Sequence, residues 1–107
     1  MVVIFEIEQV REFLLKHGSV WTVRDHPLKL GMNWMTDKRR GKKIADIKVE
    51  DKGPIKIENL VIFLGESGFE SCEEWIETIK KLNKGTIPKN LWIHHVFLKE
   101  PILEVKK

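Results

Sequence analysis

The stretch HGSVWTVR, residues 17–24, decides how the first half of this chain folds. Apolar residues recur at helical spacing from Ile7 onward, which predicts a helix that ends near His17. Gly18 is the type of residue expected just past a helix end, where the backbone turns left-handed. The β-branched and aromatic residues that follow predict a strand over residues 19–24. A single glycine therefore joins a helix directly to a strand.

Two later segments carry similarly clear local signals. Apolar and charged residues alternate over residues 44–50, which predicts a half-buried strand that is left through a turn at residues 51–54. Ser71 followed by Glu74 has the capping-box pattern, and the apolar repeat behind it predicts a helix over residues 72–83.

The remaining segments are placed by composition. Residues 91–98 are rich in apolar side chains and predict a strand, and a strand followed by a bend is expected over residues 55–64 because their apolar density is high. Residues 27–36 are ambiguous between loop and strand. Residues 101–107 are expected to form a final short strand or a frayed end. The sum predicts an α+β fold, a small antiparallel β-barrel of about five or six strands with two main helices.

Length and composition limit the class of protein. With 107 residues, of which 42% are hydrophobic and 33% charged, the chain is expected to form a single domain over residues 1–107. Its one cysteine, Cys72, excludes an internal disulfide and a cysteine-based metal cage, and is expected to be an ordinary small residue of its helix. No apolar run reaches the length of a membrane span and no signal peptide is evident, so a cytoplasmic protein without membrane contact is expected.

The positive charge is concentrated in one place. The net charge is +3, and residues 1–53 carry the whole excess, with eleven Lys and Arg against eight Asp and Glu. Five of these cations surround Gly41 and are named the basic loop below: Lys38, Arg39, Arg40, Lys42 and Lys43. Such a density either neutralises phosphates of a partner or forms a solvated turn.

Three short motifs, in the order in which they occur along the chain, resemble those of the ASCH domain family. This is a family of small PUA-like β-barrels, and the resemblance is to its small archaeal members in particular. The first is KHGSVWTVR at residues 16–24, which carries the Thr-x-Arg of the family as Thr22 and Arg24. The second is ESGFESCEEW at residues 66–75, and the third is LWI at residues 91–93. The resemblance covers most of the chain. It implies a barrel with a cleft beside the Thr-x-Arg strand and the second helix, and a role in binding RNA or a nucleotide.

The implied cleft gives the candidate binding residues. Thr22 and Arg24 are two apart on one strand, so their side chains share a face, while Trp21 and Val23 point to the other and are expected in the core. Arg24 has the planar donor fork that suits a phosphate or the acceptor edge of a base, unless an acid such as Glu66 holds it in an ion pair. The other candidates for nucleic-acid contact are His26, Trp34 as a stacking platform in a loop, Ser67, and the basic loop.

Two alternative functions stay open. Some small members of the family remove an acetyl group from acetylated cytidine nucleosides with a Lys, a Thr and a Glu, for which Lys16, Thr22 and Glu66 are the candidates here. The position of the family Lys is Ser19, which has no amine, and this departure makes catalysis the weaker expectation. The second alternative is a protein-interaction domain with a vestigial cleft. No cofactor and no metal are expected, because His94 and His95 are neighbours on a strand and point to opposite faces.

Overall fold

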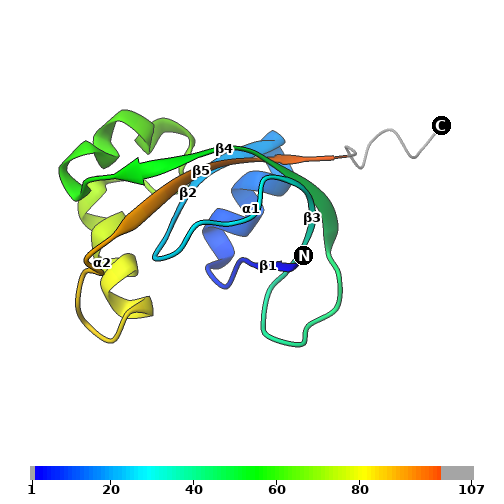
Figure 1. The fold of residues 1–107 in the computed structure, drawn as a ribbon, viewed down its shortest axis with the longest axis horizontal. Coiled ribbons are helices and arrows are strands. Elements are labelled where there is room, and N and C mark those ends of the chain that lie inside the picture. The colour runs from blue at the N-terminus through cyan, green and yellow to red at the C-terminus, as the bar shows by residue number, and fades with distance from the viewer. Residues whose placement is uncertain (1, 100–107) are drawn as a thin grey trace.

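The computed structural model describes residues 2–99 and shows an α+β fold (Figure 1). Its elements are, in chain order, β1 (Val2–Ile4), α1 (Glu8–His17), β2 (Ser19–Arg24), β3 (Gly31–Thr36), β4 (Ala45–Ile55), the 3-10 helix η1 (Ile57–Glu66), α2 (Cys72–Leu82) and β5 (Leu91–Leu98). The expected strand at residues 101–107 lies outside the described residues. None of the helices in the described part is long and apolar enough to cross a bilayer.

The five strands form one curled sheet that does not close. Their order is β1-β3-β4-β5-β2, so β1 and β2 are the two edges, and α1 lies inside the curl (Figure 1). All neighbouring strands are antiparallel except β1 and β3, which are parallel. The predicted class is therefore confirmed as α+β and barrel-like. The sheet departs from the predicted antiparallel barrel in two ways: it does not close, and β1, which contributes three residues, pairs in parallel with β3 rather than with β2.

The helix-to-strand junction at residues 17–24 is confirmed. Gly18 has a φ of 88° and its N–H donates to the carbonyl of Leu14 at 2.8 Å, which ends α1 with the left-handed residue that the sequence predicts. In β2, Val20 and Thr22 are buried. The apolar residues of α1 pack on this buried face through Val10 and Leu14, which belong to the core.

The predicted turn at residues 51–54 and strand from Ile55 are wrong. β4 continues through both segments to Ile55, with Gly53 paired to Ile93 and Pro54 to Trp92 of β5. Within residues 2–99, β4 has no partner on its other side beyond Val49, because β3 pairs only with residues 45–49. A proline is tolerated at such a place, since prolines within sheets are found on edge strands. The apolar residues 57–66 form η1, which buries Leu60 and leaves Val61 and Ile62 exposed.

Helix α2 begins after the predicted N-cap residue, Ser71. Ser71 Oγ accepts a hydrogen bond from the N–H of Glu74 at 3.1 Å. We expect Ser71→Ala to lower the free energy of unfolding by about 1 kcal/mol, because one N–H of the first turn then lacks an acceptor. Chemical denaturation measures the loss. Ser71→Asp keeps a capping oxygen and should lose much less; an equal loss in both variants would contradict this role.

Candidate ligand pocket at the open side of the sheet

A pocket of about 280 Å³ lies between the two edge strands and α2. One wall is the segment that ends β1 and leads into α1, the second is the end of β2 with the residues after it, and the third is α2 with the start of β5. The lining residues are Ile4, Phe5, Glu6, Ile7, Val10, Thr22, Val23, Arg24, Asp25, His26, Phe69, Trp75, Thr78, Ile79, Leu82, Asn83 and Leu91. The pocket thus occupies the place where the sheet stays open.

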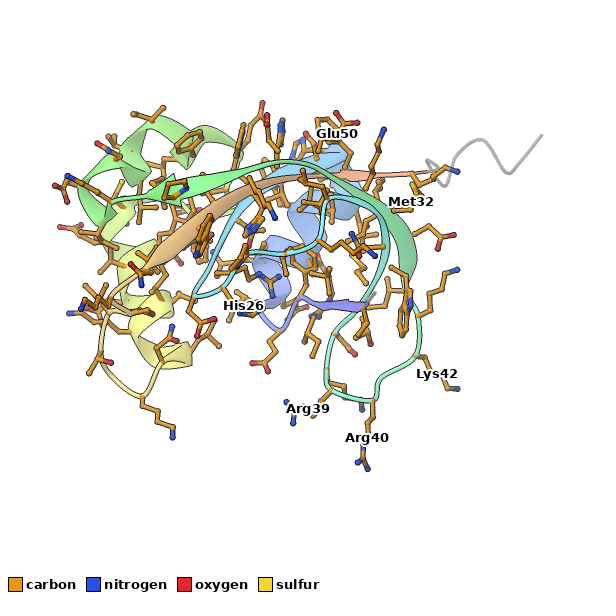
Figure 2. All side chains as sticks on the ribbon, viewed as in Figure 1. His26, Met32, Arg39, Arg40, Lys42 and Glu50 are labelled. Carbon is orange, nitrogen blue, oxygen red and sulfur yellow. The ribbon has the colours of Figure 1, made fainter. Side chains whose placement is uncertain are left out.

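Three of the residues predicted for the cleft lie together in this pocket. Thr22 is 8% exposed and Arg24 is half-buried, and both line the pocket from β2. His26 follows at the exposed end of this wall (Figure 2), and its Nδ1 lies 2.7 Å from Oδ1 of Asp25. Val23 also lines the pocket, and Trp21, on the same face of the strand, packs on Phe63 of η1. The prediction that Trp21 and Val23 lie in the core is wrong: both are half-buried, because the buried face of β2 is the one that carries Val20 and Thr22. The end of β2 therefore contributes the polar wall.

Arg24 places a half-buried positive charge in the pocket. Burial lowers the pKa of its guanidinium to about 10, and the carboxylates of Asp25 and Glu6 oppose this effect. The side chain therefore stays protonated at neutral pH. Its Cζ lies 4.9 Å from the ring centroid of Phe5, a distance at which the ring face attracts a cation.

The alternative of an ion pair between Arg24 and Glu66 is wrong. Among residues 2–99, Arg24 forms no ion pair and no side-chain hydrogen bond, and Oε1 of Glu66 instead lies 3.9 Å from Nε2 of His95. The five donors of the guanidinium are therefore free to meet a ligand.

The apolar wall was not predicted from the sequence. Phe69 and Trp75 stack with ring centroids 5.7 Å apart, and Ile79 continues this wall along α2. Two polar residues of this wall donate to carbonyls of α2: Thr78 Oγ1 donates to the carbonyl of Glu74, and Nδ2 of Asn83, the residue after the helix, donates to that of Ile79. Only the helical spacing from Trp75 to Ile79 signals this wall in the sequence, and the same spacing describes any core helix.

The candidates for hydrolysis are not brought together. Thr22 lines the pocket, but Lys16 is exposed in the last turn of α1 and Glu66 is the last residue of η1, and neither lines the pocket. Glu6 is a carboxylate that the pocket does contain, and no motif in the sequence signals it. In the part of the chain that the structure describes, Lys16 and Glu66 therefore do not lie beside Thr22 in the pocket.

Ser67 and Trp34 lie outside the pocket. Ser67 is fully buried, where its Oγ donates to the carbonyl of Leu64 at 2.8 Å and accepts from the N–H of Phe69 at 3.1 Å. It therefore shapes the turn before α2. Trp34 belongs to β3 and not to a loop, and it is half-buried beside Val2 and Asp46 in the sheet. Neither side chain lines the pocket.

The basic loop connects β3 to β4 and is exposed. Arg39, Arg40 and Lys42 project from it into solvent at a distance from His26 (Figure 2). Lys43 is already paired, with Nζ 2.7 Å from Oδ1 of Asp46. A Cβ on Gly41 would clash with Oγ1 of Thr36, so this shape of the loop requires glycine. The basic loop and the pocket are therefore two separate sites.

The two adjacent histidines point to opposite faces, as predicted. His94 is fully buried, and its Nε2 accepts a hydrogen bond from the N–H of Leu28 at 3.0 Å. Burial, with a further effect of the Arg24 charge, lowers the pKa of His94 to about 4. His95 stacks on Trp21 with centroids 4.0 Å apart, and burial lowers its pKa as well.

The described residues contain no group of three side chains able to hold a metal ion. Cys72 is a half-buried residue of α2 that packs against the core. The pocket itself offers one guanidinium, hydroxyls and carboxylates beside apolar walls.

Comparisons with family models, curated proteins and solved structures find no match for this chain. The resemblance to the ASCH family accordingly stays a prediction based on the three sequence motifs.

Proposed function

We propose that this chain is an RNA-binding module of the ASCH type that holds one nucleoside unit in the pocket. The observation that carries the proposal is Arg24, a half-buried guanidinium without an ion-pair partner among residues 2–99, in a pocket with apolar and aromatic walls. Keeping a charge partly out of water is unfavourable unless acceptors compensate it, and a ligand that brings acceptors would do so.

The chemistry of a base fits this arrangement. The planar fork of an arginine matches neighbouring acceptors on the edge of a base, as in its contacts with guanine. Proteins that read single-stranded RNA commonly accommodate the base beside aromatic and apolar side chains, a role open to Phe69 and Trp75 here. The volume of about 280 Å³ is close to the lower end of the range for small-ligand sites.

The cations of the basic loop are proposed to neutralise phosphates of the bound RNA. Four of its cations, Lys38, Arg39, Arg40 and Lys42, form no ion pair within the described residues. We expect their joint substitution by Ala to weaken binding of a mixed-sequence RNA roughly 10-fold or more at low salt. The slope of log affinity against log salt should shrink by roughly 0.7 for each phosphate of a single strand that the variant no longer neutralises.

Fluorescence anisotropy at several salt concentrations measures both effects. A matched control replaces four exposed lysines elsewhere, Lys56, Lys81, Lys89 and Lys99, and keeps the same net charge as the loop variant. Equal reductions of affinity in the two variants would show that net charge alone, and not the basic loop, attracts RNA.

A hydrolase has less support, because Lys16 and Glu66 lie outside the pocket. Incubation with acetylated cytidine, followed by chromatography of the products, distinguishes it from a binding module. We expect no deacetylation above that of a buffer control.

A further inference from the structure

Two carboxylates stand beside the single guanidinium of the pocket. Glu6 and Asp25 are both exposed and both line the pocket, from opposite walls. Both act on Arg24, since their charges raise its pKa against the effect of burial. Asp25 Oδ1 is engaged by His26 at 2.7 Å. The half-buried cation is thus flanked at the more exposed side of the pocket by two carboxylates, of which Glu6 forms no ion pair within residues 2–99 and Asp25 pairs with His26.

The charge balance of this lining is negative. Apart from His26, the charged residues among the lining side chains are Arg24, Glu6 and Asp25, which sum to one negative charge when the imidazole is neutral. A phosphate group held at about 6 Å from a carboxylate in water meets a repulsion of roughly 0.7 kcal/mol for each pair of unit charges. A hydroxyl group would instead donate to the same carboxylates. Arg24 attracts the same phosphate and offsets the repulsion by one of the two carboxylates, so that one net negative charge opposes a phosphate and the lining favours an uncharged ligand.

We propose that Glu6 and Asp25 make the pocket selective for a nucleoside unit that carries no terminal phosphate. The base presents acceptors to Arg24, and sugar hydroxyls meet the two carboxylates. This inference rests on the proposed function and specifies its ligand. Two ligands present such a unit: a free nucleoside, and an RNA that ends in a hydroxyl group and whose other phosphates lie outside the pocket.

Calorimetric titration at about pH 8 and at low salt tests this selectivity. The probes are the four common ribonucleosides, their 5′-monophosphates, and one short RNA with either a 5′-hydroxyl or a 5′-phosphate. We expect the protein to bind the phosphate-free member of a pair roughly 5-fold more tightly. Joint substitution of Glu6→Gln and Asp25→Asn should remove this preference, mainly by strengthening binding of the phosphorylated member. Glu58→Gln, an exposed carboxylate of η1 outside the pocket, should retain it.

The outcomes separate the two proposals. Equal or tighter binding of the phosphorylated member by the unaltered protein, or a preference that survives the double substitution, overturns the role of the carboxylates. If Arg24→Gln still weakens binding in that case, the proposed function stands. If none of the probes binds, both proposals fail. A preference found only within the RNA pair identifies hydroxyl-ended RNA as the ligand, and one found with nucleosides identifies the free compound.

Discussion

Replacing Arg24 by Gln is expected to weaken RNA binding roughly 10- to 100-fold. Hydrogen bonds that involve a charged group contribute about 1.5–3 kcal/mol, and the guanidinium offers the pocket five donors in one plane. Glutamine retains one NH₂ group and lacks both the charge and the fork. Because Arg24 lies in the pocket, the effect should depend on which base is presented, and should persist at salt concentrations that suppress the effect of the basic loop.

The same substitution should leave the fold nearly unchanged in stability. Arg24 forms no ion pair among residues 2–99, and its interaction with Phe5 contributes about 0.5–1 kcal/mol, which relief of the buried charge offsets. We therefore expect thermal unfolding within a few degrees of the original protein. Arg39→Gln removes an exposed arginine of the basic loop and serves as the matched control. A large decrease in stability without a decrease in affinity would identify Arg24 as a structural residue.

The protein is expected to lose about 3 kcal/mol of stability through His94 between about pH 6.5 and pH 4. In the fold, burial holds the pKa of His94 at about 4, against an ordinary value of 6.5. The unfolded chain takes up a proton in this interval and the folded chain does not, so falling pH favours unfolding. The contribution is fully present above pH 6.5 and falls by about 1.4 kcal/mol per pH unit below it.

Urea unfolding at several pH values, compared between the original protein and His94→Gln, measures this contribution. The free energy of unfolding of the original protein should fall by about 3 kcal/mol more than that of His94→Gln from pH 7 to pH 4, because glutamine does not titrate. His17→Gln removes an exposed histidine instead and should retain the pH dependence. If the His94 variant does not fold, the ring resonances of His94 in the original protein give the same test. A ring already protonated at pH 5.5 would contradict the assignment.

The elements that the sequence predicts correctly are those with local causes. The stop at Gly18 and the cap at Ser71 each depend on residues within one turn of the chain, and both are found in the structure. The predictions for residues 51–64 are wrong because the conformation of this segment depends on distant partners. Pairing with β5 keeps β4 extended through Gly53 and Pro54. The apolar residues that follow form η1, of which only one side is buried.

The pocket could be predicted only in part, for a similar reason. Thr22 and Arg24 are on one strand, and their shared face follows from the two-residue period of a strand. Glu6 and Trp75 join them only because β1 and β2 are the edges of an open sheet and α2 packs across the gap between them. Glu66 is a candidate by its position in a motif, but η1 carries it away from the pocket toward His95.

A titration followed by nuclear magnetic resonance shows whether RNA occupies the pocket. Short hydroxyl-ended RNA is added to ¹⁵N-labelled protein, and shifts of backbone amides and of the Arg24 Nε–H are recorded. The proposal predicts saturable shifts at Thr22, Arg24 and Thr78, with separate, salt-sensitive shifts in the basic loop. Shifts confined to the basic loop, with Arg24 Nε–H unchanged at saturation, would contradict a nucleoside site in the pocket.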